Sequence, residues 1–326
     1  MSLARPLLAS ALLASTTALP LTAVAQDAPL NVVSTIGMIA DVVANVGGEC
    51  VESIALMGPG IDPHLYQATA RDVQTFQDAE LILYSGYSLE GQLGDVLERF
   101  SERTPTVAVS PASIPPSDLI SVEDIYGIDP HLWMDVSLWA KIAPTIAGKI
   151  AELRPGCADA AKANAEAYVS QLAALDGWVE ESIASIPEEQ RILVTAHDAF
   201  NYYGRAYDIE VAGIQGISTE SEAGIADIRE MAETVAERDV PAVFIESTIN
   251  PRTIQAVIDA AAEQGHTIEI GGELYSDAMG AAGTAGGTYI GMIYENTRHI
   301  TEALGGTPAP LPEVLSDWAE TWGVTE

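Results

Sequence analysis

The chain has 326 residues, with 14 Lys and Arg against 47 Asp and Glu, which gives a formal net charge of −33. Such an acidic chain excludes a nucleic-acid binder, because the phosphate backbone would repel it. Its two cysteines are too few, and too far apart in sequence, for a thiolate metal site.

Residues 1–25 have the pattern of a secretory signal peptide. Arg5 precedes an apolar stretch over 7–21, and Ala-Val-Ala at 23–25 is a small-x-small cleavage pattern. We expect cleavage before Gln26 and a mature periplasmic chain with a charge of 13 − 47 = −34. No cysteine lies near the cleavage site, so we expect no lipid anchor.

The periplasm is oxidising, which bears on the two cysteines of the mature chain. Such a compartment permits a disulfide between Cys50 and Cys157. Two buried free thiols are also compatible with the sequence, so the pairing stays open at this point.

In chain order, short apolar runs rich in β-branched residues alternate with amphipathic segments. This alternation predicts an α/β fold with parallel sheets flanked by helices, and about 300 residues are typical of two domains. The predicted strands are 31–36, 51–56, 80–85 and 106–109 in the first half, and 191–196, 210–214, 242–246 and 267–270 in the second. The predicted helices among them include 72–77, 89–100, 221–238 and 251–264.

A long segment between the two halves predicts one helix. Residues 159–186 are rich in Ala, Leu, Glu and Lys and contain no Pro, and their apolar residues approximate helical spacing. We therefore expect a first metal-binding lobe over 26–157, a rigid linker helix over 158–188 and a second metal-binding lobe over 189–326. A helical connection predicts only modest closure of the lobes on a ligand.

A repeated motif points to the site. The hexapeptide Gly-Ile-Asp-Pro-His-Leu occurs at 60–65 and again at 127–132, in a chain with five histidines. Pro restricts both its own φ and the residue before it, so the histidine after each Asp-Pro step is held in a defined direction. His64 and His131 are therefore candidates for metal ligands.

Two more candidates follow predicted strands of the second half. The strand 191–196 leads directly to His197, and the strand 267–270 leads through a Gly-rich segment to Asp277. Ligands of open α/β sheets bind at the carboxyl ends of strands, so three histidines and one aspartate would form an N3O site between the lobes. The other two histidines, His266 and His299, have helical or surface contexts and are expected to be structural.

Six strings of the chain resemble the cluster A-I metal-binding proteins of ABC importers, and the TroA-like type most closely. They are Met-Gly-Pro-Gly-Ile-Asp-Pro-His at 57–64, Asp-Pro-His-Leu-Trp-Met-Asp at 129–135, Thr-Ala-His-Asp-Ala-Phe at 195–200, Gln-Gly-Ile-Ser-Thr at 215–219, Phe-Ile-Glu-Ser at 244–247 and Gly-Gly-Glu-Leu-Tyr-Ser-Asp-Ala-Met-Gly at 271–280. The resemblance implies two lobes joined by one long helix, with ligands at His64, His131, His197 and Asp277. It also implies a monomeric binding protein that delivers one ion to a membrane permease driven by a cytoplasmic ATPase.

The identity of the ion is narrowed by ligand chemistry. Three imidazoles and a carboxylate suit tetrahedral Zn²⁺, whereas Mn²⁺ prefers more oxygen ligands and lies lowest in the affinity order. Manganese-selective relatives commonly have Glu where this chain has His197, and zinc specialists carry a His-rich loop that this chain lacks. We therefore expect Zn²⁺ or Mn²⁺ as the cargo.

Nearby carboxylates are candidates for outer-shell partners. We expect Asp62, Asp129 or Asp198 to accept the distal N–H of a ligating imidazole, and Glu246 to lie near the site as an additional carboxylate. An enzyme is not expected, although a secreted zinc hydrolase and a metal-binding adhesin of the same fold are the alternatives. The helical His-Glu-x-x-His pair of zinc proteases is absent from the sequence.

Overall fold

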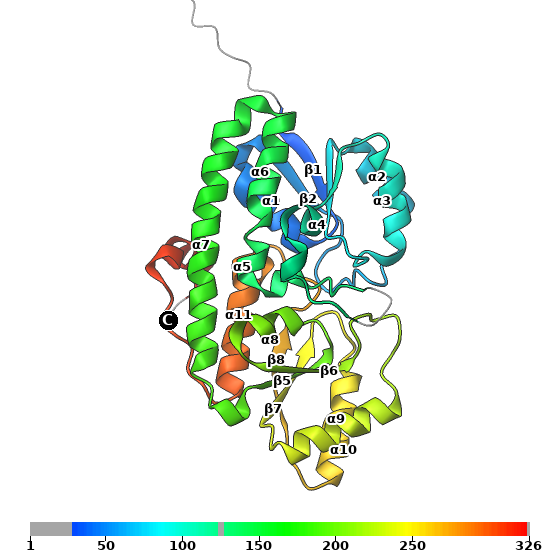
Figure 1. Ribbon diagram of the computed structural model, residues 1–326, viewed down its shortest axis with the longest axis vertical. Coiled ribbons are helices and arrows are strands. Elements are labelled where there is room, and N and C mark those ends of the chain that lie inside the picture. Colours follow the sequence, from blue (N-terminus) through cyan, green and yellow to red (C-terminus); the bar gives the residue numbers. More distant parts are fainter. Residues whose placement is uncertain (1–27, 123–126, 325–326) are drawn as a thin grey trace, which may run out of the picture.

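The first lobe of the computed structural model, which describes residues 28–122 and 127–324, is built on a parallel sheet (Figure 1). Its four strands lie in the order β2-β1-β3-β4, so the chain starts in the middle of the sheet and crosses to both sides. The strands are β1 (Leu30–Ser34), β2 (Val51–Ala55), β3 (Leu81–Tyr84) and β4 (Thr106–Ala108). The predicted strand positions are confirmed to within two residues at each end.

Helices connect and cover these strands. Helix α1 is so apolar that most of its length is buried, and the hydroxyl and carboxylate of Thr69 and Asp72 form a reciprocal capping box at the start of α2. The helices of this lobe are α1 (Gly37–Gly47), α2 (Ala70–Asp78), α3 (Gly94–Ser101), α4 (Val109–Ser113), α5 (Val136–Trp139) and α6 (Ile142–Leu153).

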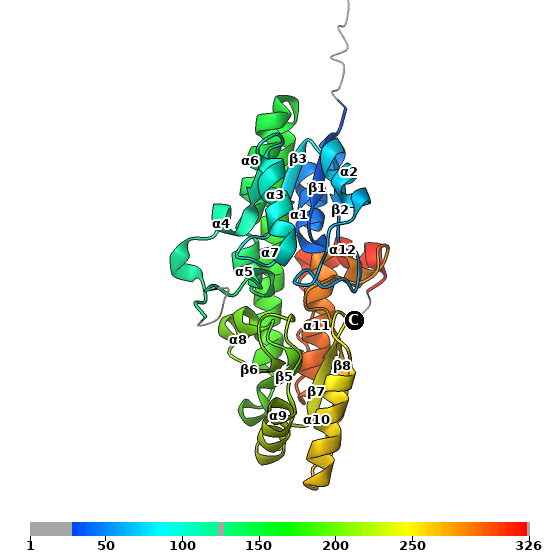
Figure 2. The same ribbon diagram turned by 90° about the vertical axis from the view of Figure 1, so that its right-hand side faces the viewer.

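The long helix predicted between the halves is α7 (Ala158–Ala184), with 27 residues and a length of about 40 Å. It runs alongside both lobes in the two views of Figures 1 and 2. A disulfide joins Cys50, directly before β2, to Cys157, directly before α7. The helix is therefore covalently tied to the first lobe at its start.

The second lobe contains two pairs of parallel strands. β5 (Ile192–His197) pairs with β6 (Glu210–Gln215), and β7 (Ala242–Glu246) pairs with β8 (Glu269–Leu274), while β5 and β7 contact each other. The helices of this part of the chain are α8 (Asn201–Tyr207), α9 (Ile225–Glu237), α10 (Arg252–Glu263), α11 (Tyr289–Ala303) and α12 (Ser316–Trp322).

The strand predicted over 267–270 is displaced in the structure. Gly271 and Gly272, which follow the predicted strand, lie inside β8. A Cβ on Gly271 would come within 2.6 Å of the Phe244 ring, and one on Gly272 within 3.0 Å of the His299 ring. The glycines are therefore there because neighbouring rings pack directly on the strand backbone.

The main hydrophobic core extends through both lobes. It includes Val32 of β1, Leu172 and Leu175 of α7, and Phe200 and Ile293 from the second half of the chain. A smaller core lies between β5, β6 and β7 and helices α9 and α10. Because α7 and α11 contribute side chains to this cluster, the two lobes share one continuous hydrophobic core. Within the part of the chain that the structure describes, no helix is long and apolar enough to cross a membrane.

Candidate metal centre

The four predicted ligands meet at the carboxyl ends of the strands, between the lobes. His64 lies in the turn that follows β2, His131 lies directly before a short 3-10 turn (Leu132–Met134), His197 is the last residue of β5, and Asp277 follows β8. All four side chains are buried, and one ligand atom from each lies within 4.8 Å of the others.

The atoms that face one another are the ones that bind metals. His64 Nε2 lies 3.3 Å from His131 Nε2, which lies 3.3 Å from Asp277 Oδ1. Asp277 Oδ2 lies 3.4 Å from His197 Nε2 and 3.8 Å from His64 Nε2. Among the described residues, neither His197 Nε2 nor the Asp277 oxygens make a hydrogen bond of ordinary geometry. Buried polar atoms are rarely left without a partner, so this donor set fits a divalent cation.

Two carboxylates orient two of the imidazoles. Asp129 Oδ1 lies 2.8 Å from His131 Nδ1, and Glu246 Oε2 lies 2.6 Å from His197 Nδ1. Each carboxylate also accepts the backbone N–H of the same histidine, at 2.9 Å and 2.8 Å. A proton on Nδ1 that is shared with the carboxylate leaves the Nε2 lone pair directed into the site. Glu246 thus contacts His197 rather than adding a further carboxylate to the centre.

The other two predicted outer-shell carboxylates have different partners. Asp62 accepts the backbone N–H of His64 at 2.8 Å and the hydroxyl of Thr219 at 2.6 Å. Asp198 hydrogen-bonds Asn201, whose amide donates to Asp129 Oδ2 at 3.1 Å. Of the three alternatives expected from the sequence, Asp62, Asp129 or Asp198, Asp129 is the one with a described contact to an imidazole nitrogen. The Asp198 carboxylate is linked to His131 through two intervening side chains.

The three histidines of the site differ in the direction in which their surroundings shift the pKa. Burial lowers the pKa of His64 to about 3. Burial also opposes the charged form of His131, but the Asp129 and Asp277 carboxylates outweigh it and raise the pKa of His131 to about 10. In the same way, Glu246 and Asp277 overcome burial and raise the pKa of His197. The three imidazoles overcome burial at Asp277 and hold its pKa well below the usual range. Asp277 is therefore ionised in the metal-free site, where its charge is paired with the imidazolium groups that a metal ion would replace.

Several residues of the site's surroundings were not singled out from the sequence. Tyr202 donates to the carbonyl of Asp129 at 3.0 Å, and Trp133 Nε1 donates to the carbonyl of Ser276 at 2.9 Å. The Trp133 ring also meets the edge of His131, with 5.3 Å between the ring centres. A buried Tyr or Trp usually finds a hydrogen-bond partner for its polar group. The aromatic residues close to the histidines in sequence were therefore the one signal from which these contacts could have been predicted.

The two remaining histidines lie away from the centre. His266 follows α10 and its Nε2 contacts the carbonyl of Val240 at 3.1 Å. His299 lies in α11 and its Nδ1 contacts the carbonyl of Glu273 at 3.2 Å. Both contacts are to backbone carbonyls of the second lobe, as expected of structural residues.

Comparison with known proteins places this site in a family. Residues 32–303 match the family model described as zinc-uptake complex component A, periplasmic. The chain is 47% identical over 282 residues to the zinc-binding protein TroA of Treponema pallidum, covering 86% of this chain and 91% of the relative. It is 44% identical over 278 residues to the manganese-binding lipoprotein MntA of Bacillus subtilis, covering 85% and 90%.

Solved structures agree with these sequence comparisons. The structure of periplasmic zinc-binding TroA from T. pallidum superposes with a TM-score of 0.82 and covers 85% of this chain and 99% of that one. Fe(III)-bound YtgA from Chlamydia trachomatis superposes with a TM-score of 0.78 at 29% identity and covers 86% and 100%. The chain therefore belongs to the family of periplasmic zinc-uptake components, with the TroA-like arrangement of two lobes and a long linker helix.

Proposed function

We propose that this protein captures one Zn²⁺ or Mn²⁺ ion with His64, His131, His197 and Asp277 and delivers it to an ABC importer. The observation that carries the proposal is the convergence of four buried ligand groups whose metal-binding atoms lie within 4.8 Å of one another. Relatives named for zinc and for manganese binding support the choice of ions.

The donor set favours a transition metal over Mg²⁺ or Ca²⁺. Three imidazole nitrogens and one carboxylate match the ligands of tetrahedral zinc, and a bidentate Asp277 would give five contacts. Hard cations such as Mg²⁺ and Ca²⁺ prefer oxygen ligands and would bind weakly to three imidazole nitrogens. Because Mn²⁺ is the weakest binder in the affinity order, we expect Zn²⁺ to be held more tightly, whichever ion the transporter carries.

The remaining features of the proposal concern location and partners. Members of this family are substrate-binding components, which implies a membrane permease and its ATPase as partners; we propose that this chain binds them as a monomer. The signal-peptide prediction falls on residues 1–25, outside the described residues, and stays a prediction, as do the domain boundaries. The Bacillus relative is named a lipoprotein, in contrast to the expectation of a chain without a lipid anchor.

A hydrolase is the weaker assignment. Catalytic zinc sites generally keep three protein ligands and one position for water, whereas four ligand groups converge here. The site is also buried, which suits retention of an ion more than turnover of an organic substrate. An adhesin of the same fold would share the metal centre and differ only in not needing a permease.

Competitive titration of the chelator-stripped mature protein with Zn²⁺ and Mn²⁺ tests the proposal. We expect one tight site per chain with preference for Zn²⁺, and we expect His197→Glu to shift the preference toward Mn²⁺ by adding an oxygen ligand. His299→Ala is the matched control, because this histidine contacts a backbone carbonyl away from the site. Absence of stoichiometric binding of either ion would refute the proposed function.

A further inference from the structure

Trp133 connects the segments that carry two of the ligands. It lies two residues after His131, and its ring packs edge-to-face against the His131 ring with 5.3 Å between the ring centres. Its Nε1–H donates to the carbonyl of Ser276 at 2.9 Å, and Ser276 directly precedes Asp277. Trp133 and Ser276 are 143 residues apart in sequence. One fully buried side chain therefore contacts one ligand and the backbone next to another.

Trp133 is itself held in place by other aromatic residues. Its carbonyl accepts the hydroxyl of Tyr289, the first residue of α11, at 2.7 Å. Its ring also packs edge-to-face against the ring of Trp139, with 6.1 Å between the ring centres. All three aromatic side chains are fully buried, and the close packing of a protein core leaves little room for them to shift. Trp133 therefore offers the two ligand segments a fixed support.

A second contact holds the Asp277 segment but does not reach His131. The side chain of Asn296 in α11 accepts the backbone N–H of Tyr275 at 2.8 Å and donates to its carbonyl at 2.7 Å. These two bonds fix Tyr275 within the second half of the chain. The hydrogen bond from Trp133 to the next residue, Ser276, joins that half to the loop of His131.

The separation of the two connected ligands matches a tetrahedral ion. His131 Nε2 lies 3.3 Å from Asp277 Oδ1. Zinc bonds to nitrogen and oxygen ligands are about 2.0–2.2 Å long, and the corners of a tetrahedron of that size are about 3.3–3.6 Å apart. Mn²⁺ prefers octahedral coordination by oxygen, which needs smaller angles between neighbouring ligands and two further ligand positions. The observed separation therefore favours Zn²⁺ as long as the two ligands keep it.

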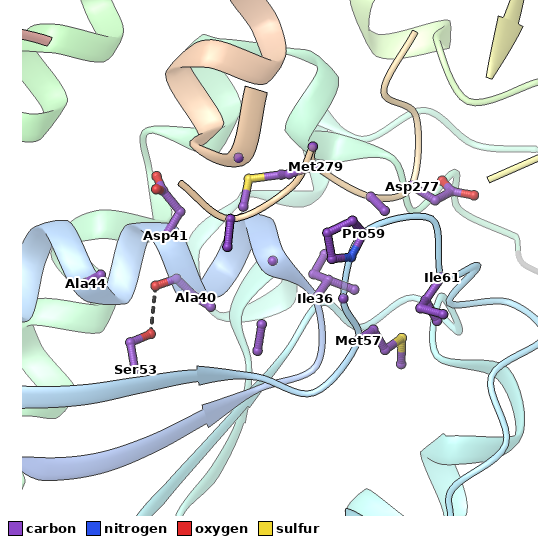
Figure 3. A pocket seen from close by; sticks show the side chains of 17 residues that line it. Ile36, Ala40, Asp41, Ala44, Ser53, Met57, Pro59, Ile61, Asp277 and Met279 are labelled. Atoms are coloured by element: carbon purple, nitrogen blue, oxygen red, sulfur yellow. Dashed lines mark hydrogen bonds between the residues drawn. The ribbon is translucent and has the colours of Figure 1, made fainter. Parts of the chain in front are cut away.

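The Asp277 segment has space beside it. A hollow of about 400 Å³ is bordered by Asp277, Ala278 and Met279 on one side and by residues of α1 and of the turn at 57–61 on the other (Figure 3). The Asp277 carboxylate points away from this hollow (Figure 3). Packing on the hollow side therefore does not prevent a shift of the segment, and the contacts on the opposite side must hold it.

We infer that Trp133 is a positioning residue that sets the preference of the site for Zn²⁺ over Mn²⁺ by holding His131 and Asp277 at a tetrahedral separation. It acts through these two ligands and does not coordinate the ion, because the indole nitrogen is a donor only. Without the indole N–H, the Asp277 segment can shift toward the hollow, and the site can then accept an ion with more ligands. This inference rests on the proposed function and concerns the selectivity of that same site.

Competitive titration of the metal-free mature protein tests this role. Zn²⁺ and Mn²⁺ affinities are measured for the wild type, Trp133→Phe and Trp139→Phe. Phe keeps an aromatic ring beside His131 and removes the indole N–H, so we expect the ratio of Zn²⁺ to Mn²⁺ affinity in Trp133→Phe to fall by on the order of 10-fold. Trp139→Phe is the matched control and should keep the wild-type ratio. It removes the same group from the same core, and within 28–122 and 127–324 its indole N–H has no hydrogen-bond partner.

The absorption spectrum of bound Co²⁺ separates positioning from a general loss of structure. Tetrahedral Co²⁺ absorbs visible light more strongly than six-coordinate Co²⁺, so the bands report the ligand geometry. We expect weaker visible bands in Trp133→Phe and wild-type bands in Trp139→Phe. An equal loss of affinity for Zn²⁺ and Mn²⁺ in Trp133→Phe, with wild-type Co²⁺ bands, would show a merely structural role and overturn the inference.

A second variant keeps the inference testable if Trp133→Phe does not fold. Tyr289→Phe removes the hydroxyl that donates to the Trp133 carbonyl and keeps the ring. It should lower the ratio of Zn²⁺ to Mn²⁺ affinity in the same direction by a smaller factor. A wild-type ratio in Tyr289→Phe would then overturn the role of Trp133.

The possible outcomes distinguish this inference from the proposed function. No stoichiometric binding of Zn²⁺ or Mn²⁺ by the wild type would refute both. Tight binding by the wild type, with the same affinity ratio in Trp133→Phe and Trp139→Phe, would overturn the role of Trp133 and leave the metal-binding function standing. A lower ratio and weaker Co²⁺ bands in Trp133→Phe alone support both.

Discussion

The two copies of Gly-Ile-Asp-Pro-His-Leu share local features but have different surroundings. Gly60 and Gly127 have φ angles of 70° and 68°, in the left-handed region that favours glycine. In each copy the Asp carboxylate accepts the backbone N–H of the histidine two residues later, at 2.8 Å and 2.9 Å. The two copies therefore share the glycine conformation and the hydrogen bond from the histidine N–H to the Asp carboxylate.

The two turns differ in burial and in the contacts of their Asp carboxylates. Leu65 of the first copy is 52% exposed, whereas Leu132 of the second is fully buried. Asp129 contacts the ring of its own histidine, whereas Asp62 turns its second oxygen to Thr219 in the other lobe. The comparison shows that the motif determines how a ligand is aimed, while the neighbours determine its charge, its burial and how firmly it is held.

The largest expected difference between the copies is in stability. Leu132→Ala should lower the free energy of unfolding by ~2–5 kcal/mol, because it creates a cavity in the core. Leu65→Ala should change it by less than about 0.5 kcal/mol, because the side chain lies at the surface. Urea denaturation of both metal-free variants measures the contrast, and equal effects would mean that the two turns are equally buried in solution.

The next difference concerns the two aspartates. Asp129→Asn should weaken Zn²⁺ binding by on the order of 10-fold to 100-fold, because the His131 ring loses the carboxylate that orients it and raises its basicity. Asp62→Asn should have a much smaller effect, since the amide oxygen still accepts the His64 N–H and the amide N–H can donate to the Thr219 hydroxyl. Chelator competition at one pH compares them; a larger effect at Asp62 would reverse our assignment of roles.

The histidines of the two motif copies, His64 and His131, should also differ in pKa in the metal-free protein. With pKa values of about 3 for His64 and about 10 for His131, only His131 is protonated at neutral pH. Zn²⁺ must displace that proton, so affinity should rise by up to about tenfold per pH unit for each such imidazole between pH 6 and 8. His197, whose pKa is also raised, should add to this slope.

Titration calorimetry in buffers of different ionisation enthalpy gives the number of protons released on binding. NMR titration of the histidine ring protons in the metal-free protein assigns the released protons to individual histidines. Binding without proton release at pH 7 would contradict the raised pKa of His131.

The smallest expected effects fall on the glycines, and here the copies should agree. Gly60→Ala and Gly127→Ala should each cost about 1–2 kcal/mol of stability, because alanine is disfavoured at positive φ. The added Cβ is tolerated sterically at both positions: it would lie 3.5 Å from the Ser247 carbonyl at Gly60 and meets no atom within 4 Å at Gly127. Thermal denaturation of the metal-free variants checks this, and a strongly unequal loss would show that the turns are not equivalent.

Much of the fold was predictable because its signals are local. Seven strands lie within two residues of their predicted positions, since buried parallel strands read as β-branched runs. Helix α1 (Gly37–Gly47) was not singled out from the sequence, although its buried residues follow helical spacing on one face: Met38, Ile39, Val42, Val43 and Val46. The eighth strand was predicted to end too early, because two consecutive glycines, Gly271 and Gly272, are not typical of a strand interior. The rings that pack against these glycines come from distant parts of the chain.

The residues of the metal centre were also predictable where the signal is local and not where it depends on distant contacts. Its four ligand residues could be proposed because each follows a strand or an Asp-Pro step. Of the outer partners, Asp129 could be proposed because it lies two residues before His131. The distant pairs could not be assigned: Glu246 and His197 are 49 residues apart, and Asp62 and Thr219 are 157 apart. Asp198, adjacent to His197 in sequence, contacts Asn201 instead.

The sequence by itself therefore determined the turns, the strands and the set of candidate ligands, because backbone preference and side-chain period act over a few residues. Only the tertiary structure decided the Cys50–Cys157 disulfide, the pairing of Glu246 with His197, and the contact that joins Asp62 to Thr219. Hydrogen bonds and charges act over a few ångströms in space, and sequence separation does not tell which distant residues the fold brings within that range.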